Sequence, residues 1–308
     1  MGLPASARVL LLPSSPSPGA PTPAPASPAA TLRVAVSGEG PAVVLIPGLF
    51  GSSFGYRKLI PKLVEAGYCA VAIEPLGVGG SAKPEKADYS LTAQADRIAA
   101  ALPALGIERA VVVVHSAAAS IVFRMAYRHP ERVAAVISMD GGAPEAATTT
   151  GFRRAMTFAP LLKLLGGRRL IRGKVRERLL SGAADPSWVT DEVVDGYMAA
   201  AGQDLGATLR VYKRMAKARE PEALAPRLRE VRCPVRLLIG TVPHQGGVNE
   251  AEVARLQQAL PSLTVERVPG VGHFIYEEDP AAVVQAVRAV SASPPIRPSC
   301  LRISNSGH

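Results

Sequence analysis

The sequence predicts an α/β fold in which a mostly parallel central sheet is flanked by helices and interrupted by an inserted helical region. Short β-branched runs alternate with longer amphipathic stretches, which is typical of strands and helices wound around a parallel sheet. The alternation stops between about residues 143 and 229, where only helical segments rich in Leu, Arg and Ala occur. Hydrophobic residues form 48% of the 308 residues, which allows a large core and excludes a chain disordered throughout.

The two ends of the chain differ from the part between them. Residues 1–30 are rich in Pro, Ala and Ser, and we expect them to be disordered because this composition buries too little apolar surface to offset chain entropy. An apolar run starts at Val9 but stops at Pro13, which is shorter than a secretory signal requires. A cytoplasmic location is therefore expected, with export as the alternative. Residues 292–308 contain three prolines and predict a loose tail.

Seven strands and five helices are expected between these ends. The strands are runs rich in Val, Ile, Leu and Ala at residues 32–37, 42–46, 69–74, 110–114, 133–139, 235–239 and 263–268. The amphipathic stretches between them predict helices at residues 56–66, 92–105, 117–129, 249–260 and 280–290. An α/β core should then comprise residues 31–142 and 230–291, with the helical insertion at residues 143–229.

The net charge of +10 raises the question of a nucleic-acid partner, because phosphate binding needs clustered Lys and Arg. Such clusters occur at residues 153–154, 168–169 and 172–178, yet no nucleic-acid-binding motif is present, so we interpret them as a solvated basic face and expect no nucleic acid. No run of about 18 apolar residues predicts a membrane span. The three cysteines lie far apart and lack metal-ligand spacing, so neither a zinc site nor a disulfide framework is expected. No metal or other cofactor is predicted.

The chemistry of the chain is concentrated where predicted strands end. Ser116 stands on a turn from the strand at residues 110–114 into a helix, which would expose its hydroxyl at the carboxyl edge of the sheet. An ordinary serine at this place would be a helix N-cap. The glycine-rich run Gly48-Leu49-Phe50-Gly51 leaves another strand and would bring backbone N–H groups close to a ligand oxygen. The loop residue His273 follows the last strand and could act as a general base for serine.

These motifs resemble those of the α/β-hydrolase superfamily, in the same order, from about residue 32 to residue 290. The matching features are the glycine turn at Gly48, the loop Gly-Val-Gly-Gly-Ser at residues 77–81, the His-Ser elbow at Ser116 and the final Gly-His-Phe at residues 272–274. The resemblance implies that Ser116 is the nucleophile and His273 the base, and that the N–H groups of Leu49 and Ala117 form an oxyanion hole.

The resemblance also implies that the helical insertion is a cap over the substrate pocket. Its apolar positions are then expected to face that pocket or the core; examples are Phe152, Phe158, Leu161 and Leu165.

Several positions depart from the family pattern. Val114 and Ala118 occupy the two glycine positions of the elbow, where strand and helix approach closely. Pro243 stands where the family usually has its triad aspartate. Asp140, at the end of the strand at residues 133–139, is the candidate replacement; otherwise it caps a loop and the acid is missing. His244 and Gln245 are weaker candidates for orienting His273.

We therefore expect a serine hydrolase that cleaves an ester, thioester, lactone or related acyl bond of a small apolar substrate through an acyl-enzyme. The alternative is a degenerate member of the fold that binds a small apolar ligand without turnover. A serine at position 116 argues against the dehalogenase and epoxide-hydrolase branches, whose nucleophile is a carboxylate. The sequence does not identify the substrate or the oligomeric state.

Overall fold

One sheet organises the computed structural model, which describes residues 8–13, 31–49, 51–146, 167–202 and 204–291. The eight strands follow the order β1-β2-β4-β3-β5-β6-β7-β8. β2 pairs antiparallel with β1 and β4, and all other neighbours are parallel, so the predicted fold class is confirmed. The strands are β1 (Arg8–Pro13), β2 (Thr31–Ser37), β3 (Ala42–Ile46), β4 (Cys69–Ile73), β5 (Ala110–His115), β6 (Val133–Met139), β7 (Val235–Gly240) and β8 (Leu263–Val268).

The edge strand β1 lies inside the segment expected to be disordered, so that prediction is wrong for residues 8–13. β1 pairs with β2 along its whole length. Leu10 and Leu12 pack against the core, while Val9 and Leu11 are 49% and 63% exposed. This alternation is that of a half-buried strand, and the Pro-rich surroundings concealed it in the sequence. The remainder of residues 1–30 and the expected tail at residues 292–308 lie outside the described residues.

The central strands are buried on both faces because helices cover both. All seven expected strands are present, with ends displaced by at most one residue. In β3, β4 and β5 every residue is buried, as is usual for parallel strands, whose runs are apolar rather than alternating. Successive side chains point to opposite faces, so Val44 joins one core cluster and its neighbour Leu45 the other.

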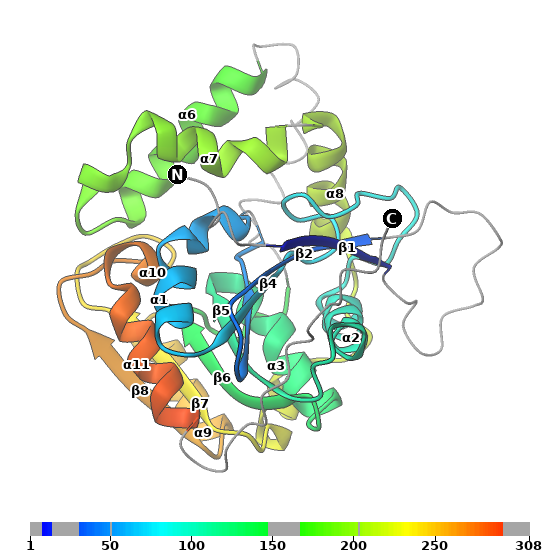
Figure 1. The fold of residues 1–308 in the computed structure, drawn as a ribbon, viewed down its shortest axis with the longest axis vertical. Helices are drawn as coiled ribbons and strands as arrows, with labels where there is room; N and C mark the ends of the chain where they lie inside the picture. Colours follow the sequence, from blue (N-terminus) through cyan, green and yellow to red (C-terminus); the bar gives the residue numbers. More distant parts are fainter. Residues whose placement is uncertain (1–7, 14–30, 50, 147–166, 203, 292–308) are drawn as a thin grey trace.

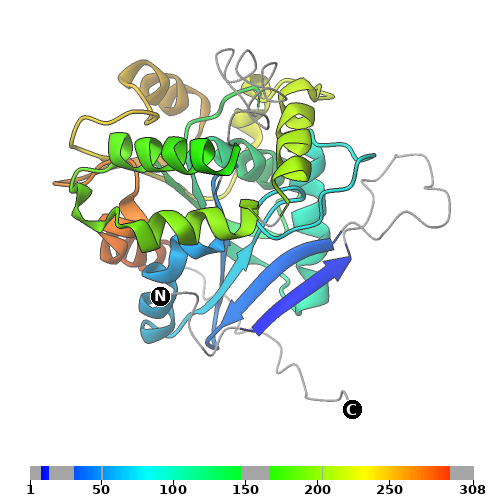
Figure 2. The same cartoon turned by 90° about the horizontal axis from the view of Figure 1, so that it is seen from above.

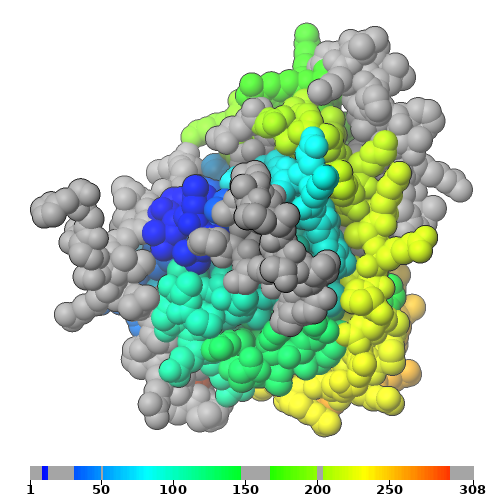
Figure 3. Space-filling view, turned by 90° about the vertical axis from the view of Figure 1, so that its right-hand side faces the viewer, coloured from blue at the N-terminus to red at the C-terminus, as the bar shows by residue number. Residues whose placement is uncertain are grey.

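The helices form two layers, one on each face of the sheet (Figure 1). α1 (Leu59–Glu65) and α11 (Pro280–Ser291) contact each other and share a core cluster. α2 (Leu91–Ala101), α3 (Ala119–Arg128) and α9 (Glu250–Ala259) contribute to the opposite cluster. All five expected helices are therefore present; α11 is one residue longer than expected and the other four are shorter. Figure 3 shows the face of the molecule formed by α2 and α3. These two helices are joined by an ion pair between Arg128 of α3 and Asp96 of α2 at 2.8 Å.

The helical insertion follows β6 and precedes β7. Its described helices are α6 (Gly167–Gly182), α7 (Asp191–Gly202) and α8 (Leu205–Lys217), with α6 beside α7 (Figure 2). The four apolar positions named above, Phe152 to Leu165, lie outside the described residues. Two backbone hydrogen bonds tie the end of α6 to loops after β7 and β8: Gln245 N–H to the Ser181 carbonyl at 3.2 Å and His273 N–H to the Gly182 carbonyl at 2.7 Å. The insertion is thus held at the carboxyl edge of the sheet.

The basic cluster on α6 is exposed and partly neutralised. Arg172 pairs with Asp191 at 2.8 Å and with Asp195 at 2.6 Å, and Arg176 pairs with Asp191 at 2.8 Å. These exposed pairs contribute little stability individually, yet they orient α6 along α7. Within the described part of the chain, none of the helices combines the length and hydrophobicity that a membrane crossing requires.

The inward and outward positions of β1 give a matched test of its pairing. We expect Leu10→Asp to lower the free energy of unfolding by about 1–3 kcal/mol, because it places a carboxylate against the core. Leu11→Asp should change it by less than about 0.5 kcal/mol, because this position faces solvent. Urea unfolding of both variants measures the difference, and equally small effects would contradict the pairing of β1 with the sheet.

Candidate active site

Ser116 lies in a strained turn at the carboxyl end of β5. Its φ is +56°, a left-handed conformation that a residue other than glycine adopts at a cost of about 1–3 kcal/mol. The extended residue His115 precedes it, and the 3₁₀ turn Ser116–Ala118 leads into α3. The turn holds the half-buried serine at the edge of the sheet, between a fully buried strand and a buried helix.

The elbow accommodates the two residues that replace the family's glycines. Val114 is fully buried and lies in register with Ile46 of β3 and Ser138 of β6, so its side chain fills a place in the sheet core. Ala118 is also fully buried in the same core cluster. The strain is therefore concentrated at Ser116 itself.

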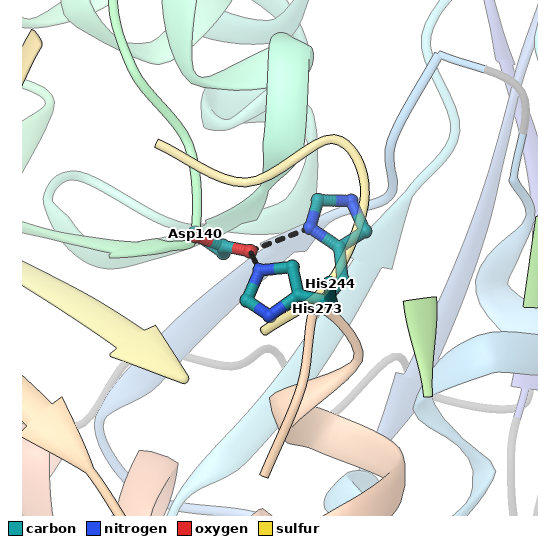
Figure 4. Close-up of side chains that lie close together, drawn as sticks. All are labelled: Asp140, His244 and His273. Carbon is teal, nitrogen blue, oxygen red and sulfur yellow. Dashed lines mark hydrogen bonds and ion pairs between the residues drawn. The ribbon is translucent and has the colours of Figure 1, made fainter. Parts of the chain in front are cut away.

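His273 is held by its backbone and by its ring. Its N–H donates to the Gly182 carbonyl, and its Nδ1 lies 2.6 Å from Oδ2 of Asp140 (Figure 4). The preceding Gly272 donates its N–H to Oε2 of Glu278 at 2.6 Å. The imidazole is 1% exposed, so its position is fixed by protein contacts rather than by solvent.

Asp140 follows β6 and meets His273 across β7. Its φ is +47°, and its N–H donates to the Leu238 carbonyl at 2.7 Å, which turns the side chain toward the loop after β8. Oδ1 accepts the Val248 N–H at 3.1 Å. The candidate acid from β6 therefore lies at hydrogen-bond distance from the candidate base.

The loop after β7 brings a second imidazole to the same carboxylate. His244 Nε2 lies 2.6 Å from Oδ2 of Asp140, and its Nδ1 lies 2.7 Å from the Val242 carbonyl. The sequence had offered His244 as an orienting group for His273, but the structure places it against Asp140. The hydrogen bonds of Gln245 with described residues use its backbone, to Ser181 and Arg178.

For both Asp140 and His273, burial and hydrogen bonding shift the pKa in opposite directions. Burial raises the pKa of Asp140, but the hydrogen bond and charge of His273, the Val248 N–H and the charge of His244 together lower that pKa below its ordinary value. Burial lowers the pKa of His273, and the hydrogen bond and charge of Asp140 recover only part of that decrease. At neutral pH an ionised carboxylate thus faces a neutral imidazole.

His115 connects the elbow to His273, and sequence reasoning did not single it out. The two rings are 4.4 Å apart between centroids, and His115 Nε2 lies 3.1 Å from the His273 carbonyl oxygen. Burial, followed by the charge of His273, lowers the pKa of His115 well below its ordinary value. Because His115 directly precedes Ser116, this packing brings His273 beside the elbow. Among the described residues no hydrogen bond joins Ser116 to His273, a looseness common before substrate binds.

The glycine turn after β3 lies against the elbow. Gly51 donates its N–H to the Gly48 carbonyl at 2.8 Å, which leaves Leu49 inside the turn. A Cβ on Gly48 would lie 3.2 Å from Nδ1 of His115, so the turn passes close to the residue before Ser116. The hydrogen bonds seen among the described residues do not use the Leu49 N–H. Ala117 is the second residue of a helical turn, a position whose N–H has no partner within the helix.

Three side chains have metal-binding atom types close together. The donor atoms of Asp140, His244 and His273 lie within 4.8 Å of one another. Both imidazoles contact the same carboxylate oxygen at hydrogen-bond distance, and a metal would have to replace both contacts. The expectation of no metal site stays a prediction.

Comparisons with known proteins identify the fold. Residues 41–184 match the family described as alpha/beta hydrolase fold. The chain is 36% identical over 132 residues to bifunctional epoxide hydrolase 2 of Rattus norvegicus, a match that covers 42% of this chain but only 24% of the rat protein. An uncharacterised protein of Mycobacterium tuberculosis is 27% identical over 273 residues, which cover 82% of this chain and 75% of that relative.

Two solved structures share the fold over nearly the whole chain. The epoxide hydrolase CorEH has a TM-score of 0.72 and 18% identity, covering 92% of this chain and 99% of that chain. A thermophilic esterase from Thermogutta terrifontis has a TM-score of 0.68 and 18% identity, covering 92% of this chain and 97% of that chain. At these identities the likeness concerns the fold alone.

The strain at the elbow predicts an unusual response to glycine. Ser116→Gly should raise the free energy of unfolding by about 1 kcal/mol, because glycine adopts a positive φ without steric cost. Ser116→Ala keeps the Cβ and should leave that free energy nearly unchanged. Chemical denaturation of the two variants makes the comparison, and a Ser116→Gly protein that is less stable than Ser116→Ala would contradict the strained turn.

Proposed function

Because the chain belongs to the α/β-hydrolase fold superfamily, we propose that it is a serine hydrolase that cleaves an acyl bond through an acyl-enzyme. The observation that carries the proposal is the 2.6 Å contact between Asp140 and His273 beside the strained Ser116 turn. This arrangement contains a nucleophile, a base and a carboxylate that orients the base, which follow β5, β8 and β6 of one sheet.

The reaction would proceed in two halves. Ser116 Oγ attacks the substrate carbonyl while Nε2 of His273 takes the serine proton, and the N–H groups of Leu49 and Ala117 stabilise the oxyanion. His273 then gives this proton to the leaving group as the acyl-enzyme forms. A water molecule, activated by the same imidazole, cleaves the acyl-enzyme and regenerates Ser116.

Asp140 would serve this cycle in two ways. Its hydrogen bond to Nδ1 fixes the tautomer in which Nε2 of His273 carries a lone pair toward the serine. Its negative charge stabilises the imidazolium that forms in each half-reaction. The neutral resting state of His273, which burial favours, is the state required of a base.

An apolar acyl substrate fits the surroundings of the site. Aromatic side chains of the helical insertion meet those near His273: Trp188 lies 5.6 Å from Phe274 between ring centroids. Similarly, Tyr197 of α7 lies 5.5 Å from Phe54, which follows the glycine turn. We propose that the helical insertion acts as the cap. The substrate, an ester, thioester or lactone, would bind where these aromatic side chains of the insertion and the core meet.

The relatives named as epoxide hydrolases suggest a different substrate, and Ser116 is the reason to prefer acyl transfer. The attacking carboxylate of that branch has no counterpart at this position. The second candidate is ligand binding without turnover, which the absence of a Ser116 to His273 hydrogen bond among the described residues would favour.

Labelling with a fluorophosphonate probe separates turnover from ligand binding. We expect rapid labelling of the wild type and none of Ser116→Ala, together with loss of p-nitrophenyl ester hydrolysis, because only an activated serine attacks the probe quickly. Ser187→Ala, which changes an exposed serine of the helical insertion, should label like the wild type. A folded wild-type protein that binds apolar ligands but never labels would support the second candidate instead.

Asp140→Asn tests the carboxylate. We expect kcat to fall by about 10²–10⁴-fold, since an amide can present the wrong partner to the ring and cannot stabilise imidazolium. The hydrogen bond and charge of Asp140 raise the pKa of His273, so their loss should move the rising limb of kcat/KM to lower pH. Steady-state rates from pH 4 to pH 9 measure both effects. An unchanged rate and an unmoved limb would remove Asp140 from the site.

A further inference from the structure

His244 makes two contacts in which each partner is an oxygen with a lone pair. Nδ1 lies 2.7 Å from the Val242 carbonyl, which has no hydrogen to give, so Nδ1 carries one. Nε2 lies 2.6 Å from Oδ2 of Asp140. A neutral imidazole protonated at Nδ1 would direct its Nε2 lone pair at this oxygen, and at such a distance two lone pairs repel.

Asp140 itself has no proton to offer in this arrangement. Its oxygens already accept the Val248 N–H and face Nδ1 of His273, contacts that an ionised carboxylate satisfies. We propose that His244 is an imidazolium at neutral pH and acts as a positioning residue that holds the Asp140 carboxylate in place for His273. Figure 4 shows one carboxylate oxygen of Asp140 in contact with both rings.

The loop that carries His244 is closely fitted to this pair. A Cβ on Gly247 would lie 2.4 Å from Nε2 of His244 and 2.8 Å from Oδ2 of Asp140, so a glycine is required for the chain to pass there. The His244 side chain is 7% exposed and that of Asp140 is fully buried. The contact is thus protected from water, which makes a hydrogen bond between charged groups strong.

Charged and titratable groups face His244 from each neighbouring element. Asp140 comes from the end of β6 and His273 from the loop after β8. Arg178 comes from α6, where its Nη1 donates to the Gln245 carbonyl at 2.8 Å, and His115 lies behind His273 at the end of β5. Asp140 is the carboxylate of this group, so it is the partner that favours a positive charge on His244.

A charged His244 has a consequence for the base, if the proposed serine hydrolase function is correct. Its positive charge lowers the pKa of His273, whereas Asp140 raises it. His244 therefore keeps Asp140 in position and also limits how tightly His273 holds a proton. In the family the acid usually follows β7. In this chain the cation His244 follows β7 instead, and it holds Asp140, the acid that follows β6.

The protonation state can be read directly and without activity. In protein labelled with ¹⁵N-histidine, we expect His244 to carry protons on both ring nitrogens at pH 7.5, and His273 to carry one on Nδ1 alone. His244→Gln identifies the His244 signals. The same spectrum should be found in Ser116→Ala, so this test is independent of whether the chain hydrolyses esters. A His244 ring with a single proton at pH 7.5 would overturn the proposal.

The kinetic test compares two variants with opposite expected shifts. His244→Gln should lower kcat about 10- to 100-fold, the scale of one lost hydrogen bond to a charged group. It should also move the rising limb of kcat/KM to higher pH, because a positive charge beside His273 is gone, whereas Asp140→Asn moves it to lower pH. If His244→Gln lowered kcat but left the rising limb of kcat/KM at the same pH, His244 would have only a structural role and the proposal would be overturned.

His129 provides the matched control. Its Nε2 lies 2.8 Å from Oδ1 of Asp96, so it also forms an imidazole to carboxylate contact, but at the end of α3, on the opposite edge of the sheet. His129→Gln should leave kcat and the position of the rising limb of kcat/KM unchanged.

If EDTA abolished wild-type activity and Zn²⁺ restored it, the cluster of Asp140, His244 and His273 would hold a metal and the proposal would also be overturned.

Discussion

The 2.6 Å contact between Asp140 and His273 is the interaction on which the account of this site depends. Both partners are buried, and they follow different strands, β6 and β8, so the contact forms only when β6, β7 and β8 are in register. A buried carboxylate without a partner would be costly, and here every described contact of its oxygens brings a donor or an imidazole. The same contact thus depends on the register of the sheet and provides the partner that the buried carboxylate of Asp140 requires.

Several features of the structure exist to hold that contact at the elbow. His115 fills the space between Ser116 and His273, and burial keeps its ring neutral, so it adds no charge beside the base. Glu278 fixes the loop before His273 and also accepts the Ala184 N–H of the helical insertion at 2.7 Å. The insertion and the loop that carries His273 therefore share one anchor, which couples the placement of the proposed cap to that of the proposed base.

Much of this could be predicted from the sequence, for physical reasons that differ between elements. The buried strands are visible because their runs are apolar throughout, and Ser116 is visible because it follows such a strand. His273 is visible because it lies in the loop between the last predicted strand and the last predicted helix. Asp140 stayed uncertain because its partner lies 133 residues away and only the sheet register joins them. β1 was missed because its short apolar run lies within Pro-rich sequence, and only its pairing with β2 identifies it as a strand. The contact of His244 with Asp140 was missed because it depends on loop geometry around Gly247.

The central claim is an acyl-enzyme on Ser116, and the most direct measurement is pre-steady-state hydrolysis of a p-nitrophenyl ester followed by mass spectrometry of the quenched protein. The account predicts a burst of about one p-nitrophenolate per chain, with the added mass of the acyl group on the peptide that contains Ser116. Linear release without a burst and without an adduct, or an adduct on a different residue, would contradict it.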